Sequence, residues 1–262
     1  MHNNNEQTYP LFLFRIASVW YRHFRVYTKS LISNGLPAFL EPLVFLAGIG
    51  LGMGTYLPKM QGMSFLTFLA TGLPMTAAMF TAAFECSYGT FIRLEFDKTY
   101  EGMLTAPLLV RDLFIGEILW CGTKGMFFSL AVVIVVAVFG LVPMPASIGA
   151  CVVGFMAGIM FASLSLLITS FVANINHFNF YFTGFLSPMF FFSGVVFPIE
   201  NLPKTLRPVA EFFPLTHVVR LCRGVDMGQF SLHMIWDILF IAGFTVILAV
   251  LAISRLKKRL VL

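Results

Sequence analysis

Six long apolar segments, separated by short polar loops, dominate this chain of 262 residues. Each contains about 20 residues or more, the length that an α-helix needs to cross the hydrocarbon core of a bilayer. They cover approximately residues 31–55, 65–90, 113–140, 149–173, 180–199 and 233–254. Because backbone polar groups must be satisfied within a membrane, we expect an all-α membrane protein with six transmembrane helices.

The composition excludes most soluble functions. Of the residues, 58% are hydrophobic and 11% are charged, against roughly 25% charged in an ordinary soluble domain. We therefore expect residues 1–262 to form one transmembrane domain, with no room for a soluble catalytic domain. The 17 Lys and Arg exceed the 12 Asp and Glu, and they lie scattered beside the spans. This pattern favours loops that face anionic lipid over a surface for nucleic acid.

Residues 11–29 are predicted to form an amphipathic helix in the membrane interface. Its polar stripe, at steps of three and four residues, contains Arg15, Ser18, Arg22, Arg25 and Lys29. Its apolar stripe contains Leu13, Ile16, Trp20, Phe24 and Tyr27. A cationic face opposite an aromatic face favours a helix that lies flat at the headgroups. The alternative is that this segment begins the first span, with its arginines snorkelling to the surface.

The distribution of Lys and Arg predicts the orientation. With both termini inside, the cytoplasmic parts hold eleven of these residues and the outer parts hold five. The loop 91–112 then lies inside and the segment 187–223 lies outside. Five prolines punctuate that outer segment, so we expect short amphipathic helices within 200–232. Because a broken backbone at membrane depth needs cover from protein or a water-filled cavity, this segment indicates a passage.

The loop 91–112 contains a candidate docking helix. Phe96, Tyr100, Met103 and Leu104 fall at helical spacing and form a small apolar face, with Glu101 on the charged side and Pro107 as the stop. An exposed apolar face on a short cytoplasmic helix fits the groove of a partner protein. The alternative is that this face rests on the bilayer.

The chain contains no phosphate-binding loop. Such a loop needs a glycine-rich turn followed by Gly-Lys-Ser/Thr, and no stretch of this sequence matches it. We therefore expect no nucleotide, cofactor or metal on this chain, and no enzymatic activity of its own. If transport is driven by ATP, the ATPase is a separate chain, and the docking helix is the place to receive it.

Two charged residues lie deep within predicted spans. Glu41 and Lys124 are ten and eleven residues from the inner ends of the first and third spans, about 15 Å deep. Their matched depth and opposite sign predict an ion pair across spans or across protomers; separate burial or snorkelling is the alternative. Glu85, Glu117 and Asp237 lie nearer the interfaces and are expected to snorkel. An ion-coupled secondary transporter that uses these charges remains a second hypothesis.

Two further clusters concern packing and the passage. Gly48 and Gly52, within a run of alternating glycines, predict close helix packing inside the protomer or at a dimer interface. Phe190, Phe191 and Phe192 make the predicted fifth span unusually aromatic. They are candidates to line the passage, and filling or anchoring the span against lipid is the alternative.

The outer segment carries a recognisable motif. Leu202-Pro203 is followed after ten residues by Pro214-Leu215-Thr216-His217 and, after five more, by Arg223. This is similar to the C-terminal signature of type-2 ABC exporter permeases, the group that includes lipo-oligosaccharide (nodulation-factor) export and daunorubicin-resistance permeases. The run TYEGMLTAPLLVRDLFIGEIL at 99–119 also resembles the loop between spans 2 and 3 of that family.

The resemblance implies a membrane subunit of an exporter in the bacterial cytoplasmic membrane. It implies a homodimer clasped to two ATPase subunits, which would hold ATP and Mg²⁺, and no catalytic residue on this subunit. Residues 96–107 would form the coupling helix, and 200–223 would cap the outer end as re-entrant or extracellular helices. The first and fifth spans would line the dimer interface. The expected cargo is a lipid-linked saccharide, a lipid or an amphipathic compound.

Overall fold

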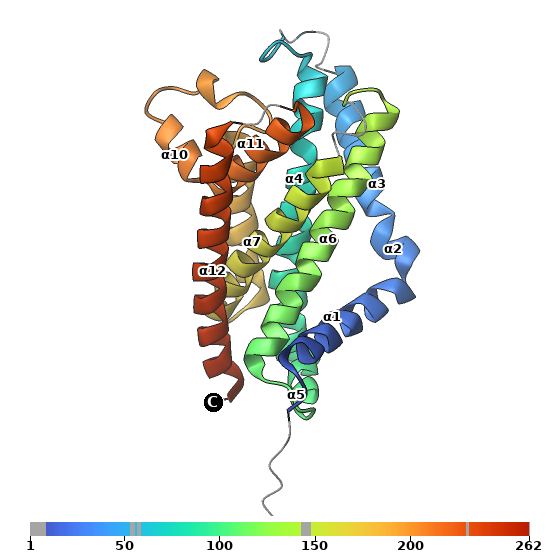
Figure 1. Ribbon diagram of the computed structural model, residues 1–262, viewed down its shortest axis with the longest axis vertical. Coiled ribbons are helices and arrows are strands. Elements are labelled where there is room, and N and C mark those ends of the chain that lie inside the picture. Colours follow the sequence, from blue (N-terminus) through green and yellow to red (C-terminus); the bar gives the residue numbers. More distant parts are fainter. Residues whose placement is uncertain (1–8, 53–55, 57–58, 143–147, 229–230, 262) are drawn as a thin grey trace, which may run out of the picture.

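The computed structural model describes residues 9–52, 56, 59–142, 148–228 and 231–261. Figure 1 shows long helices packed side by side, with shorter helices at both ends of the bundle. The long helices are α4 (Phe65–Phe84), α6 (Val110–Val138), α7 (Gly149–Phe171) and α12 (Leu232–Val261). Among the described residues the only β-structure is an isolated bridge between Met60 and Met63. The expectation of an all-α protein is confirmed.

Shorter helices connect and extend the long ones, with η denoting π- or 3₁₀-helical turns. On the N-terminal side these are α1 (Phe12–Lys29), α2 (Leu31–Gly35), α3 (Pro37–Phe45), η1 (Leu46–Leu51), η2 (Glu85–Gly89), η3 (Ile92–Phe96) and α5 (Thr99–Leu104). On the C-terminal side they are η5 (Ile175–His177), α8 (Phe178–Tyr181), η6 (Phe182–Leu186), α9 (Ser187–Phe192), η7 (Ile199–Asn201), α10 (Arg207–Phe212) and α11 (Pro214–Asp226).

Five helical stretches in the described residues are long and apolar enough to cross a membrane. They are Leu31–Ile49, Phe65–Phe96, Val110–Val138, Gly149–Phe171 and Leu232–Leu260. They correspond to the first four predicted spans and the last one, with ends that differ by a few residues. Residues 53–55 of the predicted first span, and 229–230 of the predicted outer segment, lie outside the described residues.

The predicted fifth span, 180–199, does not form a full-length helix. The consecutive helices α8, η6 and α9 contain 4, 5 and 6 residues, and together they rise only about 22 Å. A hydrocarbon core needs about 20 residues. The helix ends at Phe192 because the backbone turns at Gly194, whose φ of +79° is left-handed. The described residues therefore provide five candidate spans, where the sequence predicts six.

Helix α4 is the centre of the bundle. It begins at an N-cap in which the Ser64 hydroxyl accepts a hydrogen bond from the Thr67 amide at 3.1 Å. Most of its side chains are buried, and it packs against α6, α7 and α11, as expected of a helix that is hydrophobic all round. Phe68, Leu69, Met75 and Met79 are among its fully buried residues.

Helices α6 and α7 cross at close range, because glycines at the crossing let the two backbones approach each other. A Cβ on Gly158 would lie 2.6 Å from the Cys121 carbonyl oxygen, and a Cβ on Gly125 would lie 2.6 Å from the Gly154 carbonyl oxygen. Gly154 and Gly158 form the small-xxx-small motif that permits such an approach in a membrane. The predicted packing of Gly48 and Gly52 within the protomer is wrong. A Cβ on either glycine would meet no atom of the described residues within 4 Å.

The short helices divide between the two ends of the bundle. Helix α1, helix α5 and the C-terminal end of α12 lie at one end, and α10 and α11 lie at the other (Figure 1). At the first end, Lys98 separates η3 from α5 with a left-handed backbone (φ +51°), a conformation that side chains other than glycine adopt only occasionally. The predicted docking helix at 96–107 is therefore reduced to the six residues of α5.

Candidate functional site

Helix α1 is seated on α6 rather than lying free at the headgroups. The Trp20 indole donates a hydrogen bond to the Thr123 hydroxyl at 2.9 Å, and the rings of Trp20, Phe24 and Tyr27 surround Trp120. Arg15, expected on the headgroup stripe, is instead buried and forms a 2.7 Å ion pair with Asp112. Helix α1 is separate from the first span, because the helical backbone is interrupted at Ser30, between α1 and α2.

Glu117 on α6 is the centre of a buried polar network at this end. Its carboxylate is fully buried and receives the Tyr100 phenol, whose oxygen lies 2.5 Å from both carboxylate oxygens. The Arg93 guanidinium lies 2.8 Å away, and the His23 ring nitrogen Nε2 lies at 3.5 Å. Residues from α1, η3, α5 and α6 therefore converge on one carboxylate.

Tyr100 was predicted to face a partner protein, and this is wrong. Its side chain is 0% exposed, because the phenol reaches inward to the charged groups and its ring packs edge-on against Phe114 at 5.6 Å. Burial raises the pKa of the Tyr100 phenol well above its ordinary value, so the hydroxyl remains a hydrogen-bond donor. The tyrosine thus fastens α5 to α6.

Glu85 is the second acidic centre, and it takes the partner predicted for Glu41. The Lys124 ammonium lies 2.8 Å from Glu85, and Arg93 lies 2.8 Å from the other oxygen of the same carboxylate. Glu85 reaches Lys124 because α4 and its extension, the helical residues from η2 to η3 that follow it, pack on α6. Glu41, on α3, makes no ion pair within the part of the chain that the structure describes. The Glu41–Lys124 pair predicted across spans of one protomer is therefore wrong, and pairing across protomers stays a prediction.

The network pairs two acids with two bases inside the protein. Arg93 bridges Glu85 and Glu117, and Lys124 supplies the second positive charge against the two carboxylates. The expectation that these two acids snorkel is therefore wrong, since buried charges persist when they are paired and hydrogen-bonded. His23 stacks on Trp120 with ring centroids 6.1 Å apart, and burial lowers its pKa.

The sequence offered a signal for this network. Glu117 and Lys124 are seven residues apart on one helix, and Glu85 and Arg93 are eight apart on another. Both spacings place the pair on one helical face. Polar residues that share a face of an apolar helix turn toward protein. The signal does not reveal the partner helix, which only the packing of α4 on α6 supplies.

Part of the predicted docking face remains exposed around α5. The Phe96 side chain is 64% exposed, and the Glu101 side chain is also exposed and pairs with Lys98 at 3.4 Å. Met103 and Leu104 are half-buried and pack against the core. Phe96 at the end of η3, together with Glu101, Met103 and Leu104 on α5, contributes to the surface at this end of the bundle.

Two adjoining cavities form a slot between α3, α4 and α6. The larger cavity, of about 570 Å³, includes Glu41, Glu85 and Lys124 in its lining. The smaller one, of about 180 Å³, is lined mainly by apolar residues, and both cavities share Glu41 and Phe80. The slot therefore has a charged compartment beside the buried network and an apolar compartment beyond it.

The predicted aromatic cluster contributes one residue to the slot. Phe190 lines the apolar compartment, and its ring meets that of Phe45 edge-on at 5.9 Å. Phe191 and Phe192 are exposed and are not among the residues that line either compartment. The structure therefore separates Phe190 from its two neighbours.

At the opposite end, Arg223 fastens α11 to α4. Its guanidinium donates to the Thr71 hydroxyl at 3.0 Å and to the Gly194 carbonyl at 2.6 Å. It also donates to the carbonyls of Phe68 and Val195 at 3.1 and 3.3 Å, and it lies 3.7 Å over the Phe68 ring. Four hydrogen bonds satisfy this cation, and none of its partners among the described residues is a carboxylate.

The other residues of the outer motif also have structural contacts. His217 lies 2.6 Å from Asp237 on α12 and stacks on Phe240 at 3.8 Å. Asp237 is 1% exposed, so the expectation that it snorkels is wrong. Pro214 begins α11, where a missing N–H is tolerated, and the Pro203 carbonyl closes a turn with the Leu206 amide at 2.8 Å.

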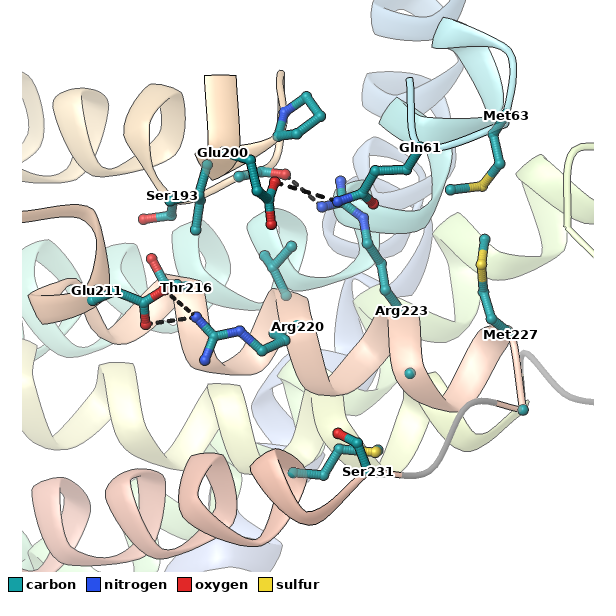
Figure 2. A pocket seen from close by; sticks show the side chains of 17 residues that line it. Gln61, Met63, Ser193, Glu200, Glu211, Thr216, Arg220, Arg223, Met227 and Ser231 are labelled. Carbon is teal, nitrogen blue, oxygen red and sulfur yellow. Dashed lines mark hydrogen bonds and ion pairs between the residues drawn. The ribbon is translucent and has the colours of Figure 1, made fainter. Parts of the chain in front are cut away.

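A cavity of about 600 Å³ opens beside α11 (Figure 2). Its lining comes from α11, the start of α12, the segment after α9 and the loop before α4. Figure 2 shows Arg220 joined to Glu211 and Gln61 joined to Glu200. The Arg220 guanidinium lies 2.5 Å from both oxygens of Glu211, and the Gln61 amide lies 3.4 Å from Glu200.

Comparison with known proteins gives a consistent assignment. A family model described as ABC-2 type transporter matches residues 14–227. Nodulation protein J of Sinorhizobium fredii (strain NBRC 101917 / NGR234) is 32% identical over 243 residues, 93% of each chain. Nodulation protein J of Rhizobium leguminosarum bv. viciae is also 32% identical, over 93% of this chain and 94% of that protein. The inner membrane transport permease YadH of Escherichia coli (strain K12) is 18% identical over 80% of this chain and 81% of that one.

The family match extends from α1 to the end of α11. It therefore includes both the network around Glu117 and the outer motif at Arg223. Five helical stretches of the described residues have the length and hydropathy of membrane spans. The chain belongs to the ABC-2 type transporter family and is a multi-pass inner-membrane permease of an ABC exporter.

Proposed function

We propose that this permease moves a lipid-linked saccharide, a lipid or an amphipathic compound out of the cytoplasm or the inner leaflet. The slot between α3, α4 and α6 supports this cargo class, because it joins a charged compartment to an apolar one. An amphipathic molecule can place its polar group near Glu41 and Lys124 and its hydrocarbon near Phe45 and Phe190. A passage for simple ions does not need the apolar compartment.

Two ATPase subunits, each carrying ATP and Mg²⁺, drive the transport in this proposal. They bind at the end of the bundle that holds α1 and α5, through Phe96, Glu101, Met103 and Leu104. This end and the C-terminal end of α12 then face the cytoplasm, with the N-terminus inside as well. The charge distribution of the sequence supports that orientation, since the inner parts hold more Lys and Arg.

The observation that carries the proposal is the hydrogen bond between Tyr100 on α5 and Glu117 on α6. A force applied to α5 is transmitted through this bond and Arg93 to α6 and the extension of α4. These helices line the slot. Nucleotide-driven movement of the ATPases therefore changes the packing around the slot, which alternates between two arrangements.

The permease acts as a homodimer in this proposal. Gly48 and Gly52 are open toward the outside of the protomer, and small residues allow two membrane helices to approach closely. A second copy that packs on this surface lies beside the slot, so that cargo passes along the boundary between the two protomers.

Co-purification tests the proposal. The permease is expressed with an ABC ATPase subunit from the same organism, purified and reconstituted, and the ATPase activity of the preparation is measured with and without an amphipathic glycolipid. We expect a complex of two permeases and two ATPases whose hydrolysis is stimulated by cargo. A permease that binds no ATPase while its α5 is intact contradicts the proposal. Gradient-driven transport by the permease alone supports the ion-coupled hypothesis instead.

A further inference from the structure

The cavity beside α11 continues into a second cavity. The first, of about 600 Å³, and the second, of about 420 Å³, share Gln61, Pro198 and Glu200 in their linings. Two of these shared residues are joined by the hydrogen bond from Gln61 to Glu200, which at 3.4 Å is longer than the usual N–H···O distance. Two adjoining cavities with shared lining residues fit a chain-like ligand better than a compact ion.

The cations of this site are occupied by protein groups. Arg220 is bound on both sides, to Glu211 and to Asp237 at 3.1 Å. Arg223 donates to carbonyl groups and to a hydroxyl. A phosphate or carboxylate ligand would have to displace these partners. The site is therefore not arranged for an anion.

Other polar groups around the site retain hydrogen-bonding capacity. Within the described residues, the Glu200 carboxylate has only the long bond from Gln61, which leaves lone pairs for a ligand. Ser193 is 1% exposed, and its hydroxyl has no partner among the described residues. Ser231 adds a second hydroxyl to the lining. One carboxylate, one amide and two hydroxyls offer donors as well as acceptors, which matches a neutral ligand rich in hydroxyl groups.

The walls between these polar groups are apolar. Met63 and Met227 face each other at one side of the cavity (Figure 2). Methionine side chains adapt to irregular apolar surfaces, such as the C–H faces of a sugar ring. A divalent cation is a poor fit, because Ca²⁺ takes six to eight oxygen ligands and Glu200 is the single carboxylate of the lining that is free of an ion pair within the described residues.

From this geometry we propose that the two cavities form a binding site for the saccharide chain of the cargo at the outer end of each protomer. This inference rests on the proposed function, and it adds a site that is distinct from the slot. Glu200 and Gln61 accept and donate hydrogen bonds to successive sugar hydroxyls. The Gln61–Glu200 bond opens when a chain occupies both cavities, and Arg223 holds the surrounding helices in place.

Binding of free sugars tests the inference. The complete permease–ATPase complex in lipid nanodiscs is titrated calorimetrically with glucose, cellobiose and cellotetraose, and with a polyethylene glycol of matched length. Affinity is expected to rise with the length of the saccharide, as the second cavity is filled, and polyethylene glycol, which lacks the hydroxyl donors, is expected not to bind. Equal affinity for glucose and cellotetraose, or binding of polyethylene glycol as tight as that of cellotetraose, overturns the inference.

Two variants locate the site. Glu200→Gln and Ser193→Ala are each expected to weaken cellotetraose binding, about tenfold for Glu200→Gln because its carboxylate makes the stronger hydrogen bonds. Neither is expected to lower the melting temperature, because Glu200 is exposed and the Ser193 hydroxyl is unpaired among the described residues. Lys204→Gln is the matched control, since Lys204 is exposed nearby and lines neither cavity. Unchanged binding in Glu200→Gln and Ser193→Ala also overturns the inference.

The same preparation separates this inference from the proposed function. Its ATPase activity is measured with the amphipathic glycolipid before the titration. Stimulated hydrolysis with no sugar binding overturns the outer site and leaves the exporter function intact. A failure of stimulation contradicts the proposed function itself, whether or not sugars bind.

Discussion

The phenol of Tyr100 lies 2.5 Å from both carboxylate oxygens of Glu117, with both residues fully buried. This contact joins a six-residue helix at the end of the bundle to α6, a helix of 29 residues. It converts a predicted external docking residue into an internal connection. The first prediction concerns that connection.

Replacing Tyr100 by Phe should destabilise the protein and uncouple ATP hydrolysis from the binding of cargo. The variant leaves the buried Glu117 carboxylate without its shortest hydrogen bond, at a cost of about 1–3 kcal/mol. Thermal unfolding in detergent measures that cost, and glycolipid-stimulated ATPase activity measures coupling. Tyr88→Phe is the control, because the Tyr88 hydroxyl makes an exposed 3.2 Å bond to Asn179. Equal effects of the two variants contradict the assignment.

The partner of Lys124 can be identified by two double-mutant cycles. Lys124→Met is combined with Glu85→Gln in one cycle and with Glu41→Gln in the other. We expect a coupling energy of about 0.5–3 kcal/mol for Lys124 with Glu85, because the two are in contact within a buried network. The cycle with Glu41 should give a value near zero. Chemical denaturation supplies the free energies, and the reverse ranking restores the pair predicted from sequence.

Adding a methyl group should distinguish the two glycine motifs. Gly158→Ala places a Cβ 2.6 Å from a backbone carbonyl, and overpacking of this kind costs about 1–3 kcal/mol. Gly48→Ala meets no atom of the described residues, so the protomer should keep its melting temperature. If the proposed dimer packs on this face, Gly48→Ala lowers self-association instead. Size-exclusion chromatography with light scattering detects that change.

The docking of α1 should weaken below neutral pH. Burial lowers the pKa of His23 in the folded protein, against the opposing attraction of Glu117 and Glu85 and together with the repulsion of Arg93 and Arg22. The folded state then binds fewer protons than the unfolded state. The contribution of neutral His23 to the stability of the folded protein is therefore fully present above the ordinary pKa of 6.5. It is lost as the pH falls toward the lowered pKa of the folded protein.

Hydrogen exchange in α1 at pH 7.5 and pH 5.5 measures this effect. We expect faster exchange at the lower pH in the native chain and a smaller difference in His23→Gln, which carries no titrating ring. His177→Gln is a suitable control, because His177 is an exposed histidine that lies in η5, shortly after the C-terminal end of α7 and outside α1. An equal pH response in the native chain and His23→Gln would assign the effect to another group.

The sequence alone determined the fold class and the family. Apolar segments of about 20 residues can satisfy their backbone in lipid only as helices, and this requirement holds for each segment by itself. The outer motif from Leu202 to Arg223 is likewise a property of the linear sequence, and the comparisons bear out the resemblance it carried. Helix α1 was predicted nearly to its observed bounds, since its amphipathic periodicity is local.

Only the tertiary structure decided which charges meet. Depth along a helix placed Glu41 opposite Lys124, but an ion pair also needs the two helices to be neighbours on the right faces. The packing of α4 on α6 brings Glu85 to Lys124 instead. The same packing turns Tyr100 inward to Glu117. The periodicity of a sequence shows on which face of its own helix a residue lies. Which face of which neighbouring helix lies opposite is decided only when the bundle is assembled.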